Sequence, residues 1–126
     1  MSAIVVNGCE LEAVAPATGD IEITSSPSED ITVNDNGVFF KEIAFSVSNS
    51  NGGGSVTNND GSGTGKIKAT CTTVTDADGN GVILVTDVSD SVTINGTKPS
   101  SSGSVPASGT ITVKIKKAGQ SDVEVS

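Results

Sequence analysis

Apolar and polar residues alternate with a period of two through most of this chain, and clusters of Gly, Asn, Asp and Ser interrupt the alternation at short intervals. This alternation is typical of strands that bury one face, and the interrupting residues are those that form turns. The clearest alternating stretches are residues 20–24, 43–47, 66–74 and 110–116. We therefore predict an all-β single domain over residues 1–126, with about ten short strands in a sandwich or a β-cone.

Shorter strands and turns complete this prediction. Strands are expected at 4–6, 31–33, 38–40, 82–85, 91–94 and 122–125, with tight turns at the Asn-Gly pairs 36–37 and 95–96. The Ser, Gly and Pro residues of 98–108 predict a loop. Residues 9–17, which reach Pro16, form the one candidate helix.

The apolar core has few residue types to draw on. The chain holds three Phe and no Trp or Tyr, so Val, Ile, Leu and Ala must supply most of the core. In the stretch 66–74 the alternation places Ile67, Ala69, Cys71 and Thr73 on one face. We interpret Cys9 and Cys71 as small buried apolar side chains, because a disulfide is unexpected in a reducing cytoplasm and two thiols make an incomplete zinc site.

The net charge of −8 argues against several partners. Nucleic-acid phosphates and anionic membrane surfaces both require clustered Lys and Arg. The N-terminal residues have no basic region and no long apolar run, so we expect no signal peptide and no stable membrane anchor. The chain is expected to be made in the cytoplasm and to stay there or to leave within a larger particle.

Catalysis is not expected. The chain has no His, which removes the usual general base and the Ser–His and Cys–His arrangements. Its carboxylates are scattered over turns and strand faces rather than paired, and no phosphate-binding glycine loop is present. We predict that the protein is not an enzyme.

One stretch follows the pattern of a calcium loop. Asp76, Asp78 and Asn80 occupy the first, third and fifth positions of the template, and Asp87 occupies the twelfth. Asp is shorter than the usual Glu at the twelfth position, and strands rather than helices flank the loop. A plain β-turn accounts for the Asp-Gly-Asn-Gly sequence equally well.

An internal repeat is also visible. Residues 31–64 and 72–110 share short matching segments in the same order, among them Asn-Gly-Val at 36–38 and 80–82. Chance matches are common in chains rich in Ser, Thr, Gly and Val. If the repeat is structural, two similar β units pack around a pseudo-symmetry axis.

Three stretches together resemble a known family. Residues 4–9 open the chain with a strand and Asn-Gly, residues 89–99 form a strand followed by Asn-Gly-Thr-Lys-Pro, and residues 109–123 resemble the end of small phage proteins of the group. The chain thereby resembles the PAAR-like proteins, which are β-rich cones on the trimeric spike of contractile phage tails and type VI-like injection systems. The resemblance implies a structural role at the spike tip or baseplate of a virion, tailocin or injection particle.

The resemblance also implies a metal near the apex of the cone. Members of the family use His and Cys for it, and in this chain Cys9 and Cys71 would be the ligands of zinc or iron. The Pro-Ala-Ala-Arg signature is absent, and Thr97-Lys98-Pro99-Ser100 stands in its place. Calcium at the Asp76 loop is the other metal to consider.

Three functions follow from these observations. The first is a spike-tip cap or baseplate component whose partner is a trimeric spike or another tail subunit. The second is a capsid decoration or tail-tube protein, which would be present in many copies. The third is a calcium-dependent adhesion or carbohydrate-binding module. Sugar binding usually requires exposed aromatic side chains, whereas Phe39, Phe40 and Phe45 all fall on predicted core strands.

Overall fold

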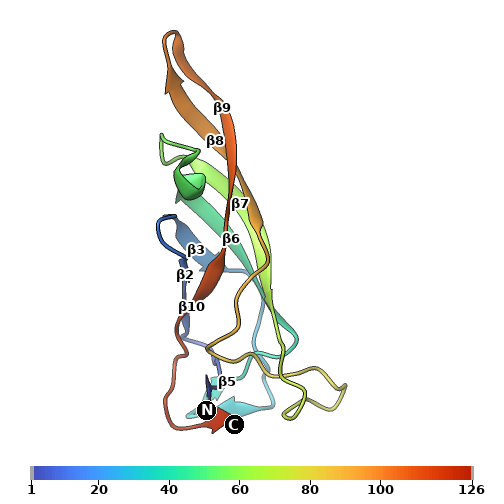
Figure 1. Ribbon diagram of the computed structural model, residues 1–126. Helices are drawn as coiled ribbons and strands as arrows, with labels where there is room; N and C mark the ends of the chain where they lie inside the picture. The colour runs from blue at the N-terminus through green and yellow to red at the C-terminus, as the bar shows by residue number, and fades with distance from the viewer. Residues whose placement is uncertain (1, 126) are drawn as a thin grey trace.

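The computed structural model describes residues 2–125 and is elongated and almost wholly β. A five-stranded antiparallel sheet in the order β3-β6-β7-β8-β9 forms the middle of the molecule (Figure 1). The hairpin of β8 and β9 extends past this sheet at one end, and both termini lie at the other end. The elements are β1 Ser2–Ala3, β2 Glu10–Ala13, β3 Asp20–Ile23, β4 Thr32–Val33, β5 Asn36–Gly37, β6 Glu42–Ser50, η1 Gly52–Gly54, β7 Gly61–Lys68, β8 Val92–Ser100, β9 Gly103–Ile111, β10 Val113–Lys117 and β11 Glu124–Val125.

The main core lies under the middle sheet and follows the predicted alternation. Ile43, Phe45 and Val47 of β6 are all buried, as the period of two predicts for one face of a strand. Ile111, Val113 and Ile115 also point inward, which confirms the prediction for 110–116. The prediction of an all-β protein is therefore confirmed.

Strands β2 and β10 form a separate antiparallel pair. Two ion pairs link them on the surface, Lys114–Glu12 at 3.4 Å and Lys117–Glu10 at 3.5 Å. The helix expected within 9–17 is wrong, because Glu10–Ala13 pairs with β10 instead. Pairing with β10 stabilises these four alternating residues more than helix formation would, because an isolated helix of nine residues is only marginally stable.

The hairpin of β8 and β9 overturns two expectations. Asn95 and Gly96 do not form a turn, and residues 98–108 are not a loop. Instead β8 runs on to Ser100 and pairs with β9 in unbroken register from Val92↔Ile111 to Ser100↔Gly103. The outer part of this hairpin is exposed on both faces, so its residues show no apolar alternation that could have predicted strands.

Two strand boundaries also differ from the expectation. The strand predicted over 66–74 ends at Lys68. The predicted hairpin around 31–40 is present, but its turn is Asn34 and Asp35, with φ of 53° and 66°, while Asn36 and Gly37 are paired strand residues. Asn and Asp tolerate this left-handed backbone better than most residues, so both turn positions suit the sequence.

The only helical element among residues 2–125 is the short 3₁₀ turn η1. The side-chain oxygen of Asn51 holds it by accepting from the N–H groups of Gly53 at 3.0 Å and Thr18 at 3.1 Å. Over the same residues, no helix has the length and apolar character to cross a membrane.

Candidate functional site

Three inner segments, residues 3–7, 37–41 and 81–85, meet end to end in a closed ring at the end that holds the termini. The middle residues of the segments form a cycle of backbone hydrogen bonds. Val5 N–H donates to Ile83 O at 2.9 Å, Ile83 N–H to Phe39 O at 2.9 Å, and Phe39 N–H to Val5 O at 3.1 Å. Each segment thus donates to one neighbour and accepts from the other.

A second cycle joins the ends of the same segments. The last residue of each donates to the first residue of the next, as Asn7 N–H to Gly37 O at 2.8 Å, Lys41 N–H to Gly81 O at 2.8 Å and Val85 N–H to Ala3 O at 2.9 Å. The antiparallel bridges Ile4↔Leu84, Val6↔Val38 and Phe40↔Val82 repeat the pattern. The three segments are therefore related by a pseudo-three-fold axis.

An outer strand flanks each inner segment at an equivalent place. The outer strands are residues 123–125, 31–33 and 74–76, the last of which is paired by a single bridge, Thr75↔Gly81. The carbonyl of the first residue in each accepts from an inner segment. Ile4 N–H donates to Val123 O at 3.1 Å, Val38 N–H to Ile31 O at 3.0 Å, and Val82 N–H to Val74 O at 3.0 Å. We name the three pairs unit I (123–125 with 2–7), unit II (31–41) and unit III (74–85).

One side chain caps the start of each outer strand. In unit II, Ser28 Oγ accepts from the N–H groups of Asp30 at 3.3 Å and Ile31 at 3.1 Å. In unit I, Gln120 Oε1 accepts from those of Asp122 at 2.7 Å and Val123 at 2.8 Å.

In unit III the cap is Cys71. Cys71 Sγ and Thr73 Oγ1 are hydrogen-bonded at 3.6 Å, and this bond is the main reason that the pKa of the Cys71 thiol is lowered, with smaller contributions from the N–H groups of Val74 and Thr73. The thiol thus has the same place as the Ser28 hydroxyl in unit II, and this accounts for a cysteine in an otherwise polar loop.

The ring separates two apolar clusters. Val5, Phe39 and Ile83 belong to the main core under the middle sheet. Ile4, Val38 and Val82, one residue earlier in each segment, belong to a second cluster. Because neighbouring side chains in a strand point to opposite sides, the second cluster lies on the side of the ring away from the main core.

The internal repeat is therefore of a different kind from the one expected. The match of Asn36-Gly37-Val38 with Asn80-Gly81-Val82 is real, since these residues are equivalent in units II and III. The prediction of two units is wrong, because the chain forms three. Unit I was missed because the two ends of the chain supply its strands and Ser2-Ala3-Ile4 lacks the Asn-Gly signal.

The residues of the calcium-like loop make internal hydrogen bonds. Asp76 Oδ1 accepts from the N–H groups of Asp78 at 3.0 Å and Asn80 at 2.9 Å, and Asp76 Oδ2 accepts from the Asn80 amide at 3.2 Å. The bond from the Asn80 N–H is the main reason that the pKa of Asp76 is lowered. These bonds are those of a plain β-turn in unit III.

Asp87, at the twelfth position of that template, is buried and makes its hydrogen bonds outside the turn. Its carboxylate accepts from the Thr70 hydroxyl at 2.6 Å and from the Leu84 N–H at 2.8 Å. Both cysteines are free thiols; Cys9 is buried in the main core as expected, but Cys71 is only half-buried beside the second cluster, so the interpretation as a buried side chain is wrong for Cys71. Within residues 2–125 no group of three or more His, Cys, Asp or Glu side chains is placed to hold a metal.

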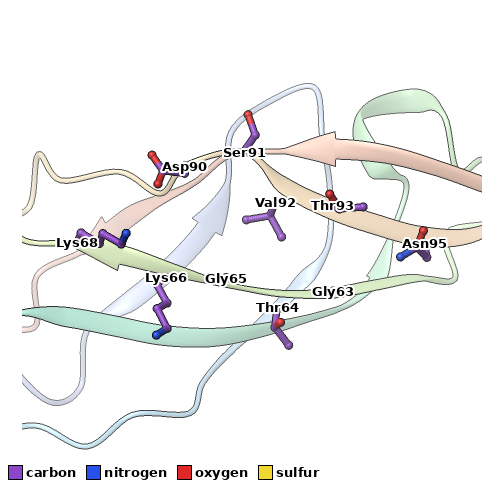
Figure 2. A pocket seen from close by; sticks show the side chains of 10 residues that line it. All are labelled: Gly63, Thr64, Gly65, Lys66, Lys68, Asp90, Ser91, Val92, Thr93 and Asn95. Carbon is purple, nitrogen blue, oxygen red and sulfur yellow. The ribbon is translucent and has the colours of Figure 1, made fainter.

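A cleft of about 460 Å³ lies between β7 and β8, which pair at Ser62↔Asn95 and then separate (Figure 2). Figure 2 shows Lys66 and Lys68 on one strand and Asp90 on the facing segment. Lys66 Nζ bonds Glu42 Oε2 at 2.9 Å, which lowers the pKa of Glu42. The other lining residues are Gly63, Thr64, Gly65, Ser91, Val92, Thr93 and Asn95. This lining pairs no nucleophile with a base, so we assign no chemistry to the cleft.

Comparison with known proteins gives no relative: no family model, curated protein or solved structure matches the chain. The pseudo-three-fold end is therefore the feature from which we argue function.

Proposed function

We propose that this chain is a structural cap at the tip of a trimeric spike in a contractile tail or related injection particle. The pseudo-three-fold ring carries the proposal. One chain with three equivalent units can offer three similar surfaces, each to one subunit of a homotrimer around a common axis. A surface without such an axis would contact the three subunits in three unrelated ways.

Two further features support this role. The resemblance of residues 4–9, 89–99 and 109–123 to PAAR-like proteins points to the same place in a particle. The elongated shape also suits a cap, because the three-fold end is at one extreme and the β8–β9 hairpin projects from the other (Figure 1). The expected function is mechanical: antiparallel ladders transmit load without a catalytic group.

The copy number of the chain in purified particles tests the proposal. Quantitative mass spectrometry against the spike protein should give one copy of this chain for every three spike subunits. Hundreds of copies per particle would refute the cap and favour a decoration or tail-tube protein. Absence from every particle would also refute it.

A further inference from the structure

The second side of the ring carries three exposed apolar side chains. Ile31 is 42%, Val74 37% and Val123 37% exposed. Within residues 2–125 the only other large apolar side chain of comparable exposure is Val88, at 54%. A single exposed valine needs no explanation, so the relation among the first three is what matters.

These three residues are equivalent under the pseudo-three-fold axis. Each is the first residue of an outer strand, and its carbonyl accepts from Ile4, Val38 or Val82 of its own unit. Directly opposed residues of antiparallel strands carry their side chains on the same face. Ile31, Val74 and Val123 therefore lie on the same side as the second apolar cluster, away from the main core.

We propose that Ile31, Val74 and Val123, here called the apolar triad, anchor the chain on a homotrimer whose subunits each present one apolar socket bordered by Lys or Arg. This rests on the proposed function and names the contact surface that the spike would use. The surrounding sequences differ among the units, as Asp30-Ile31-Thr32, Thr73-Val74-Thr75 and Asp122-Val123-Glu124 show. Each keeps a β-branched apolar residue at the one position that the axis relates.

The charge around the apolar triad indicates which side chains should border the socket on the partner. Acidic side chains are next to Ile31 and Val123 in sequence, the turn of unit III that follows Val74 carries Asp76 and Asp78, and the only lysine of the three units is Lys41. The exposed acids are Asp30, Asp35, Asp78, Asp122 and Glu124. An acidic rim around apolar anchors matches a basic rim on the partner, and like charges there would repel it.

Photo-cross-linking in the producing cells tests the apolar triad. Benzoylphenylalanine is placed at position 31, 74 or 123, and at position 88 as the control, because Val88 is more exposed than the triad residues but belongs to no unit. We expect the three triad positions to cross-link to the same partner protein, a homotrimer, while position 88 does not. Mass spectrometry of the products identifies the partner.

Substitution gives a second measurement that does not depend on the cross-linker. Ile31→Ser, Val74→Ser and Val123→Ser should each lower the amount of chain retained on purified particles by a similar factor of about ten. Val88→Ser should leave it unchanged. Raising the salt concentration in the wash should release more wild-type chain, since the rim contacts are ionic. Thermal unfolding of each variant separates loss of binding from loss of fold.

The outcomes separate the two proposals. Cross-links to three different proteins, or only to a second copy of this chain, would refute the triad. If one copy is found per spike trimer but only position 88 cross-links, the proposed spike-tip function stands and the apolar triad is refuted as the contact surface. If the three triad positions cross-link to one homotrimer that is not part of any tail particle, the triad stands as a contact surface and the spike-tip function is refuted.

Discussion

The three-fold end and the outer part of the β8–β9 hairpin are both built from short antiparallel strands, but their contacts differ in range. In the hairpin residues 97–106, here called the arm, the strand pairing joins only residues that are near one another in sequence. The ring joins residues 3–7, 37–41 and 81–85, which are distant in sequence. The arm is also exposed on both faces, whereas the ring separates two apolar clusters.

This difference indicates where stability resides. Burial of apolar area is the main favourable term in folding, and the arm buries little of it. What fixes the arm is polar: Asp60 accepts from the Thr97 N–H at 2.8 Å, and the Asn58 amide donates to Thr97 Oγ1 at 2.9 Å and to Ser104 Oγ at 3.1 Å. The ring should therefore set the stability of the whole chain, and the arm should be nearly independent of it.

The largest effect is expected at the centre of the ring. Phe39 is 2% exposed and packs in the main core. Phe39→Ala should lower the free energy of unfolding by about 3–5 kcal/mol because it leaves a cavity. Val105→Ala in the arm is the matched control and should change little. Denaturant unfolding measures both, and equal losses would remove the distinction between the two regions.

A smaller but still large effect is expected from crowding in unit III. A Cβ on Gly81 would lie 2.0 Å from the Cys71 carbonyl oxygen, and one on Gly37 would lie 2.1 Å from that of Ser28. Gly81→Ala should cost about 3 kcal/mol of unfolding free energy, since backbone must move. Ala3, the equivalent residue of unit I, already carries a Cβ, so Ala3→Gly should cost about 1 kcal/mol or less. A tolerated Gly81→Ala would contradict the packing of unit III.

Alkaline pH should lower the free energy of unfolding through Cys9, which lies in the main core. Burial raises the pKa of the Cys9 thiol from 9.0 to about 11. Since the unfolded thiol ionises first, its contribution to stability is complete below pH 9 and is lost as the pH rises toward 11. We expect a loss of about 2 kcal/mol at pH 11 relative to Cys9→Ala, measured by denaturant unfolding of both proteins across this range. Parallel pH profiles would show that the thiol is solvated.

The cap of unit III gives a more modest test of the three-fold equivalence. Cys71→Ala leaves the N–H groups of Thr73 and Val74 without their partner and should cost about 1 kcal/mol in thermal unfolding experiments. Cys71→Ser should cost less, because Ser28 performs the same role in unit II. If the alanine variant were as stable as the serine variant, the equivalence of the caps would fail.

The smallest effect is expected in the arm. Replacing residues 99–104 by Asn-Gly would join Lys98 to Val105, which already face each other, through a two-residue turn. The free energy of unfolding should change by about 0.5 kcal/mol or less, as for most exposed sites. A loss of several kcal/mol in the free energy of unfolding would show that the arm stabilises the rest of the protein.

The sequence predicted the parts of this fold that bury one face of a strand. The alternation in 43–47 and 110–116 correctly gave the inward residues of β6, β9 and β10. It did not give the arm, because strands exposed on both faces have no apolar period. The helix expected near Pro16 was wrong because pairing with β10, distant in sequence, outweighed a weak local pattern.

The three-fold ring was beyond this kind of prediction for a different reason. Its segments are held by backbone hydrogen bonds, which leave little trace in residue identity. The Asn-Gly-Val match at 36–38 and 80–82 revealed two of the three units, and Ser2-Ala3-Ile4 could not have revealed the third. The exposed residues Ile31, Val74 and Val123 look unremarkable until the axis relates them.

The way in which unit I closes has a consequence for how the protein folds. Its strands β1 and β11 pair Ser2 with Val125 and Ala3 with Glu124, so they join opposite ends of the chain. Contacts of such long sequence separation slow folding, because the entropy of closing the chain is lost before the contact is made. On the ribosome, the outer edge of β1 therefore stays open until residues 123–125 have been synthesised, although residues 3–7 can already pair with 37–41 and 81–85 in the ring. Completion of unit I would be among the last events of folding, and the open edge of β1 would be an aggregation risk of the nascent chain.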